Sequence, residues 1–218
     1  ANISSELAAR RKCLVVTTAE GSSVYPSTIG EAVSFPNEDR KREANSFSYR
    51  PFVQEIHPPI RLLIFGEGPD SAPLQKFCEL LGWQCFEISD AGPIPFESDE
   101  WTAAIVKSHN FGRDFVALAK LLPPNLRYVG LIGPKQRRNE LLNELLQIGV
   151  PMNAGFFAPA GLDLNAETPE EIALAVISEI QRVFAGGSGQ SLRDRKQPIH
   201  YPSATNPDSK IGWQKSQR

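Results

Sequence analysis

The feature that most constrains the fold is a regular alternation of short apolar runs with amphipathic stretches over residues 58–185. The apolar runs cover residues 62–65, 85–88, 103–106 and 128–132, with a weaker one near 155–157. Their lengths are typical of strands that are buried on both faces. Five such strands alternating with four helices predict an α/β fold, a doubly wound and mostly parallel sheet of the Rossmann type.

Apolar residues recur at helical spacing between these runs, over residues 74–81, 115–122 and 141–148. The last helix has the clearest start signal. Thr168, Pro169 and Glu171 supply an N-cap, a proline at N1 and a glutamate at N3, and Gly186 is expected to end the helix.

The 218 residues allow one full domain and a fragment of another. We expect residues 58–185 to form the domain. Residues 1–57 are expected to form a truncated N-terminal segment with one strand at 13–18 and irregular structure from 21–23 onward. Residues 186–218 are expected to form an extended basic tail.

Charge and composition restrict the classes of partner and the location that we expect for the protein. The 23 Lys+Arg and 25 Asp+Glu are nearly balanced, which disfavours nucleic-acid and membrane-surface partners. No stretch approaches the roughly 18 apolar residues of a membrane span, and no signal peptide is evident, so a cytoplasmic location is expected. The three cysteines suit reduced thiols and neither a disulfide framework nor a metal site.

A glycine turn follows the first strand of the domain at residues 66–71. Gly66 permits the tight turn, and Gly68 lets the backbone approach a phosphate or a pterin. Ser71 replaces the third glycine of the dinucleotide-binding pattern. The alternative is a turn needed only for packing between strand and helix.

Two acidic residues affect whether the glycine turn can bind a dinucleotide. Asp70 would place a carboxylate beside the pyrophosphate, which is unfavourable in a dry site. Asp90, after the second strand, is the candidate partner of a ribose hydroxyl.

Polar residues also follow the third strand. His109 is expected at the ligand-facing edge of the sheet, where it would donate a hydrogen bond to a ligand or shuttle a proton, unless it only bonds to backbone. Asp114 begins the next helix, where an acid satisfies the helix dipole.

The fourth strand runs into a second glycine turn at residues 130–138. Gly133 is followed by Lys135, Arg137 and Arg138 in the first turn of a helix. Cations and free backbone N–H groups there indicate an anion site, with a solvated basic surface as the alternative. Motifs of serine hydrolases, zinc proteases and P-loop enzymes are absent from the sequence.

Five ordered segments, at residues 59–74, 108–114, 127–137, 159–173 and 191–200, together resemble the C-terminal Rossmann domain of the xanthine dehydrogenase accessory (XdhC/CoxI-like) proteins. The resemblance implies an accessory factor for molybdenum hydroxylases such as xanthine dehydrogenase. Such a factor binds molybdopterin, assists its sulfuration and delivers it, generally as a homodimer, and is a cofactor chaperone and not itself an enzyme. The site would use Gly66, Gly68, His109 and residues 133–138.

The sequence departs from the family pattern in two places. The family places a complete domain with a glycine-flanked cysteine before the Rossmann unit, where this sequence has about 57 residues with Cys13 in an apolar run. The arginine usual after the second strand is also absent from residues 89–91. The alternatives are an NAD(P)-binding oxidoreductase, or a degenerate paralogue that acts only in dimerisation or docking.

Overall fold

The computed structural model describes residues 2–18, 21–26, 52–89 and 92–196. Asp90 and the tail beyond residue 196 lie outside the described residues. The described chain forms two compact units, which are considered separately: one spans Pro59–Gln190, and the other comprises the described residues up to Pro58 and from Ser191 onward.

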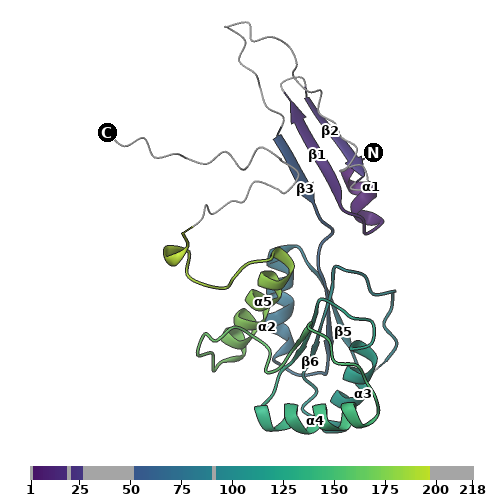
Figure 1. The fold of residues 1–218 in the computed structure, drawn as a ribbon, viewed down its shortest axis with the longest axis vertical. Helices are drawn as coiled ribbons and strands as arrows, with labels where there is room; N and C mark the ends of the chain where they lie inside the picture. Colours follow the sequence, from purple (N-terminus) through teal and green to yellow (C-terminus); the bar gives the residue numbers. More distant parts are fainter. Residues whose placement is uncertain (1, 19–20, 27–51, 90–91, 197–218) are drawn as a thin grey trace, which may run out of the picture. The chain divides into compact units, whose positions relative to one another are not determined.

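The larger unit is a five-stranded sheet with four helices (Figure 1). Its elements are β4 (Arg61–Phe65), α2 (Ser71–Leu81), β5 (Gln84–Ile88), β6 (Thr102–Val106), α3 (Phe111–Leu121), β7 (Tyr128–Leu131), α4 (Lys135–Gln147), β8 (Phe156–Phe157) and α5 (Pro169–Ala185). All neighbouring strands are parallel, in the order β5-β4-β6-β7-β8. Counted from the first strand this is 2-1-3-4-5, a doubly wound order, so the predicted fold class is confirmed.

Helices cover both faces of this sheet. α2 packs beside α5 on one face and α3 beside α4 on the other (Figure 1). Successive residues of a strand point to opposite faces, so Leu62 and Ile64 of β4 join the core under α2 and α5, whereas Leu63 and Phe65 join the core under α3 and α4. Burial on both faces explains why the strands appear in the sequence as continuous apolar runs.

The start of α5 is a complete capping box, as predicted. The Thr168 side chain accepts a hydrogen bond from the Glu171 N–H, and the Glu171 carboxylate accepts from the backbone N–H groups of Thr168 and Glu167. These bonds lower the pKa of Glu171. The helix ends at Gly186, which adopts the expected left-handed conformation at φ 69°.

The lowered pKa of Glu171 makes this cap sensitive to pH. Its stabilising contribution is fully present above the pKa of an unfolded glutamate and is lost as the pH falls through the lowered value. We therefore expect Glu171→Ala to reduce stability at pH 7 and to approach the wild type in acid, measured by urea unfolding across pH. Glu170→Ala removes an acid from the same turn and leaves the box intact; an equal pH-dependent loss in that variant would contradict the prediction.

A buried polar network ties β7 to α5. The Tyr128 hydroxyl donates to Glu179 Oε2 at 2.9 Å, and the Gly161 N–H donates to the same oxygen at 2.8 Å. Burial, and then the Glu179 carboxylate, raise the pKa of Tyr128 well above its ordinary value. The phenol therefore stays protonated as a donor, and the network anchors the loop that follows β8.

The smaller unit contains α1 (Ile3–Ala8) and an antiparallel sheet in the order β2-β1-β3, from β1 (Cys13–Thr18), β2 (Gly21–Pro26) and β3 (Phe52–Ile56). The strand predicted at 13–18 is confirmed. The irregular structure expected at 21–23 is wrong, because these residues begin β2 and pair with β1 through the backbone. Pairing of this kind needs no apolar alternation. Leu192–Asp194, in the expected tail, form one 3-10 turn.

Candidate functional site

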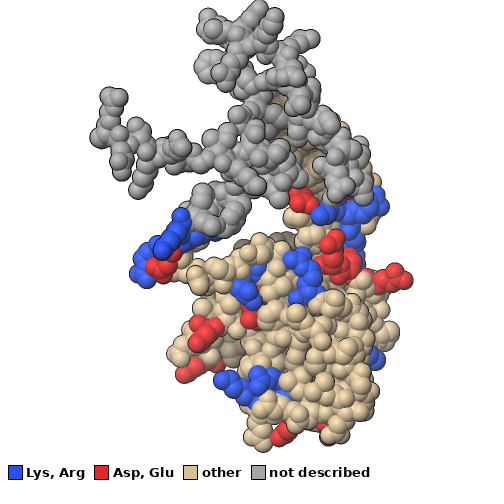
Figure 2. Space-filling view, in the orientation of Figure 1, with Lys and Arg blue, Asp and Glu red and all other residues tan. Residues whose placement is uncertain are grey.

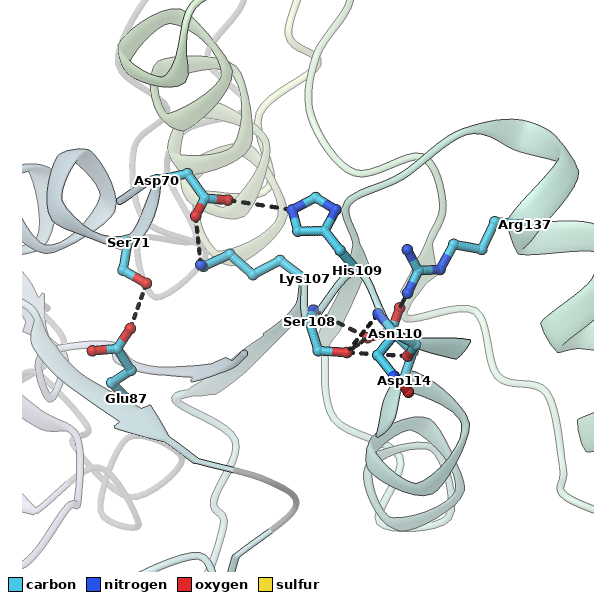
Figure 3. Close-up of polar contacts among 9 residues, drawn as sticks. All are labelled: Asp70, Ser71, Glu87, Lys107, Ser108, His109, Asn110, Asp114 and Arg137. Carbon is cyan, nitrogen blue, oxygen red and sulfur yellow. Dashed lines mark hydrogen bonds and ion pairs between the residues drawn. The ribbon is translucent and has the colours of Figure 1, made fainter. Parts of the chain in front are cut away.

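The topology places the candidate site between β4 and β6. The chain leaves β4 toward α2 on one face of the sheet and leaves β6 toward α3 on the other. A crevice forms where neighbouring strands diverge in this way, at their carboxyl ends. The glycine turn after β4 and residues 107–110 after β6 meet there (Figure 3).

Gly66 lets the two strand ends approach each other. Its φ is 111°, and a Cβ atom on it would lie 2.5 Å from the Cα of Ser108. Only glycine fits such a contact without displacing backbone. Gly68, at φ 145°, leaves room for the Asp70 side chain, because its Cβ would lie 2.7 Å from Asp70 Oδ1.

Asp70, Lys107 and His109 form a polar cluster beside this turn (Figure 3). The Lys107 side chain is fully buried, and its Nζ donates to Asp70 Oδ1 at 2.8 Å. The other Asp70 oxygen lies 3.8 Å from His109 Nε2. The carboxylate that we expected to repel a pyrophosphate therefore has an ammonium partner.

His109 follows β6 at the carboxyl edge of the sheet. Its side chain is 63% exposed, and its φ is 54°, a conformation that non-glycine residues adopt infrequently. Such strained residues cluster at functional sites. The imidazole is therefore available to a ligand while it remains near Asp70.

Asp114 does more than satisfy a helix dipole. It lies fully buried in the first turn of α3, and its Oδ1 accepts from the Ser108 N–H at 3.1 Å and from Ser108 Oγ at 2.5 Å. Its Oδ2 contacts Arg137 Nη2 at 2.5 Å as an ion pair, without hydrogen-bond geometry. The carboxylate thus joins the end of β6 to α4.

Two of the three cationic side chains expected at the anion site instead have partners within the protein. Arg137 pairs with Asp114, and Arg138 Nη1 donates to the carbonyl of Ala158 at 3.0 Å. Lys135 is exposed at the first position of α4 and has no ion pair or hydrogen bond from its side chain within the described part of the chain. Pro134 precedes it and provides no side-chain cap, so the first N–H groups of α4 remain open to an anion.

An acid does lie beside the glycine turn, but it belongs to β5. Ser71, at the start of α2, donates from Oγ to Glu87 Oε1 at 2.5 Å. The sequence pattern predicts this acid after the strand, at Asp90, whereas Glu87 lies inside the strand. Among the residues described, no group of three or more His, Cys, Asp or Glu is placed to hold a metal ion.

These features define a doubly wound α/β domain with a polar crevice at its switch point. Residues 62–180 match the family model described as the XdhC Rossmann domain, and the chain belongs to that family.

Two curated relatives match the chain in alignments of 152 positions, which cover 59% of this chain. One, described as a probable xanthine dehydrogenase subunit of Bacillus subtilis (strain 168), is 31% identical, and the match covers 44% of that protein. The other, the uncharacterized protein YqeB of Escherichia coli (strain K12), is 30% identical, with 28% covered. The chain thus matches less than half of the length of either relative.

A solved structure shares the fold. The crystal structure of a protein described as a xanthine dehydrogenase from Bacillus halodurans superposes with a TM-score of 0.66 and 22% identity, covering 84% of this chain and 65% of the other.

Among the described residues, no helix has both the length and the apolar character needed to cross a membrane. On the face of the larger unit drawn in Figure 2, charged side chains form small separate groups on a mostly uncharged surface.

Proposed function

We propose that the protein is an accessory factor for a molybdenum hydroxylase of the xanthine dehydrogenase type. It binds molybdopterin at the switch point and assists the maturation or insertion of that cofactor, without catalysing a reaction of its own. Membership of the XdhC family and the name of the Bacillus subtilis relative support this role. The proposal includes a cytoplasmic homodimer, as the family resemblance implies.

The observation that carries the proposal is the placement of three kinds of group at the carboxyl ends of neighbouring parallel strands. A glycine turn follows β4, an exposed imidazole follows β6, and an uncapped helix start follows β7, with a lysine that has no partner among the described residues. Such a set suits a ligand with a phosphate and a polar ring.

The donors present fit molybdopterin. Lys135 and the first N–H groups of α4 would hold the phosphate. His109 would bond to the polar ring, while Asp70 and Lys107 keep the turn in place. The bound group supplies the redox chemistry of the enzyme that receives it.

Removal of the free lysine tests this assignment. Lys135→Ala is expected to weaken molybdopterin binding about tenfold or more, because a charge-assisted hydrogen bond contributes roughly 1.5–3 kcal/mol. Arg138→Ala is expected to weaken it further by releasing the loop from Ala158. Binding is measured by anaerobic titration, and Lys76→Ala, which removes an exposed lysine of α2, is the matched control. Unchanged affinity in a variant that carries both Lys135→Ala and Arg138→Ala would refute the anion site.

Copurification tests the partner. The full chain should capture an apo molybdenum hydroxylase from the same cell in preference to the cofactor-loaded enzyme. Equal capture of both forms, or of neither, would argue against a role in insertion.

A second candidate, an NAD(P)-binding protein, is favoured by one observation. Ser71 and Glu87 place an acid beside the glycine turn, where dinucleotide-binding domains bind ribose hydroxyls. Micromolar binding of a nicotinamide nucleotide, lost in Glu87→Gln and unaccompanied by pterin binding, would select this function over the first.

A further inference from the structure

Two of the three cysteines lie on the same face of the larger sheet. Cys78 is fully buried and belongs to the apolar stripe of α2, one turn after Leu74. Cys85 is paired in register with Leu62 of β4, so its side chain points to the same face, toward α2 and α5. Both cysteines therefore contribute to the core on this side of the sheet. The switch-point site described above uses neither of them.

A tight turn brings the two cysteines together. Gly82, which ends α2, is left-handed at φ 69°. The Trp83 N–H donates to the Cys78 carbonyl at 2.8 Å, and β5 begins at the next residue. The Cys78 thiol donates a hydrogen bond to Cys85 Sγ. The turn from helix to strand thus holds one thiol against the other.

The two thiols differ in exposure and in acidity. Cys85 is half-buried, whereas Cys78 is fully buried. The hydrogen bond from Cys78 lowers the pKa of Cys85 and outweighs burial and the carboxylates of Glu87 and Glu79, which raise it. The same hydrogen bond, and then burial, raise the pKa of Cys78. The thiolate is the reactive form of a cysteine, so Cys85 is the thiol that a small oxidant attacks first.

We propose that Cys78 and Cys85 form a redox-active thiol pair, which a peroxide converts to a disulfide that fastens β5 to α2. Cys85 Sγ attacks one oxygen of hydrogen peroxide. An S–O bond forms, the O–O bond breaks, and the thiol proton leaves with the other oxygen as water. Cys78 Sγ then attacks the sulfenic sulfur: an S–S bond forms, the S–O bond breaks, and the Cys78 proton leaves with the hydroxyl as a second water. Two thiols are oxidised while one peroxide is reduced to two waters.

The disulfide has a structural consequence because β5 lies at one edge of the five-stranded sheet. Among the described strands, β5 pairs only with β4. A covalent bond from Cys85 to the helix gives the strand a second attachment, so oxidation slows the local opening of β5. The inference goes beyond the accessory role proposed above and does not depend on it.

Peptide mapping tests the thiol pair directly. The full chain is reduced, treated with hydrogen peroxide and digested with a protease that cleaves after glutamate. Glu79 lies between the two cysteines, so their peptides stay together only through a disulfide. We expect a linked peptide that has lost two hydrogens, about 2 Da, and that dithiothreitol separates again. Hydrogen exchange at residues 84–88 should be slower in the oxidised protein. Absence of the linked peptide, or unchanged exchange in fully linked protein, would overturn the proposal.

Substitutions separate the roles of the two thiols. Cys85→Ser removes the accessible thiol, so the reaction of Cys78 with peroxide should slow about tenfold or more. Cys78→Ala removes the second thiol, so Cys85 should stop at the sulfenic acid, which dimedone traps. Cys13→Ala removes a thiol from the smaller unit and is the matched control, expected to form the disulfide at the rate of the wild type. Undiminished reaction of Cys78 in Cys85→Ser, or loss of the linked peptide in Cys13→Ala, would contradict the assignment.

Discussion

Replacing Asp70 by alanine is expected to lower the free energy of unfolding by about 3–5 kcal/mol. The reason is that Lys107 is fully buried and has its ammonium 2.8 Å from Asp70 Oδ1. Without the carboxylate, a buried charge is left uncompensated, and this costs far more than the loss of an exposed ion pair. Urea unfolding followed by circular dichroism measures the effect.

The reciprocal variant serves as the control. Lys107→Met places an apolar chain of similar length in the same buried position and leaves Asp70, whose side chain is 29% exposed, in contact with water. We expect it to cost less than half as much as Asp70→Ala. If Lys107→Met proves the more destabilising variant, the buried ammonium does not control the stability of the turn.

Gly66→Ala is expected to destabilise the larger unit by about 2–5 kcal/mol, from the added strain and overpacking. The new Cβ would meet the Ser108 backbone at 2.5 Å in a conformation, φ 111°, that alanine adopts poorly. The strand ends must separate, so amide shifts at residues 107–109 should change, and ligand binding at the crevice should be lost. Calorimetry and NMR report the two effects.

Gly82→Ala provides a matched comparison. Gly82 is also left-handed, at φ 69°, but a Cβ there meets nothing within 4 Å. Its substitution should cost only the conformational strain, roughly 1–2 kcal/mol. Equal losses in the two variants would mean that the contact between Gly66 and Ser108 contributes little.

The sequence predicted the larger unit well because its strands are buried on both faces and its helices have apolar stripes. The runs at 62–65 and 103–106 fall inside β4 and β6, and the start of α5 was recognised from three residues. β2 was missed because its residues are exposed or half-buried and are ordered by backbone pairing with β1.

The sequence analysis placed the candidate residues at the carboxyl ends of the strands, where the structure has them, but it did not predict which side chains pair with each other. A lysine directly after an apolar strand, such as Lys107, is expected from sequence to be an exposed charge. Its burial depends on the carboxylate of Asp70, 37 residues earlier. Arg137 was expected to face an anion, and it turns to Asp114 because α3 and α4 pack side by side. Local patterns carry no information on such contacts between distant segments.

The contact between Gly66 and Ser108 has a consequence for how the proposed site would select a ligand. The backbone of Ser108 fills the space beside Gly66, so this contact does not depend on which side chains surround it. In the site proposed above, discrimination between ligands would then come from other groups at the strand ends, such as His109 and Lys135. Related domains can therefore change what they bind by exchanging a few rim residues while the base of the site stays the same.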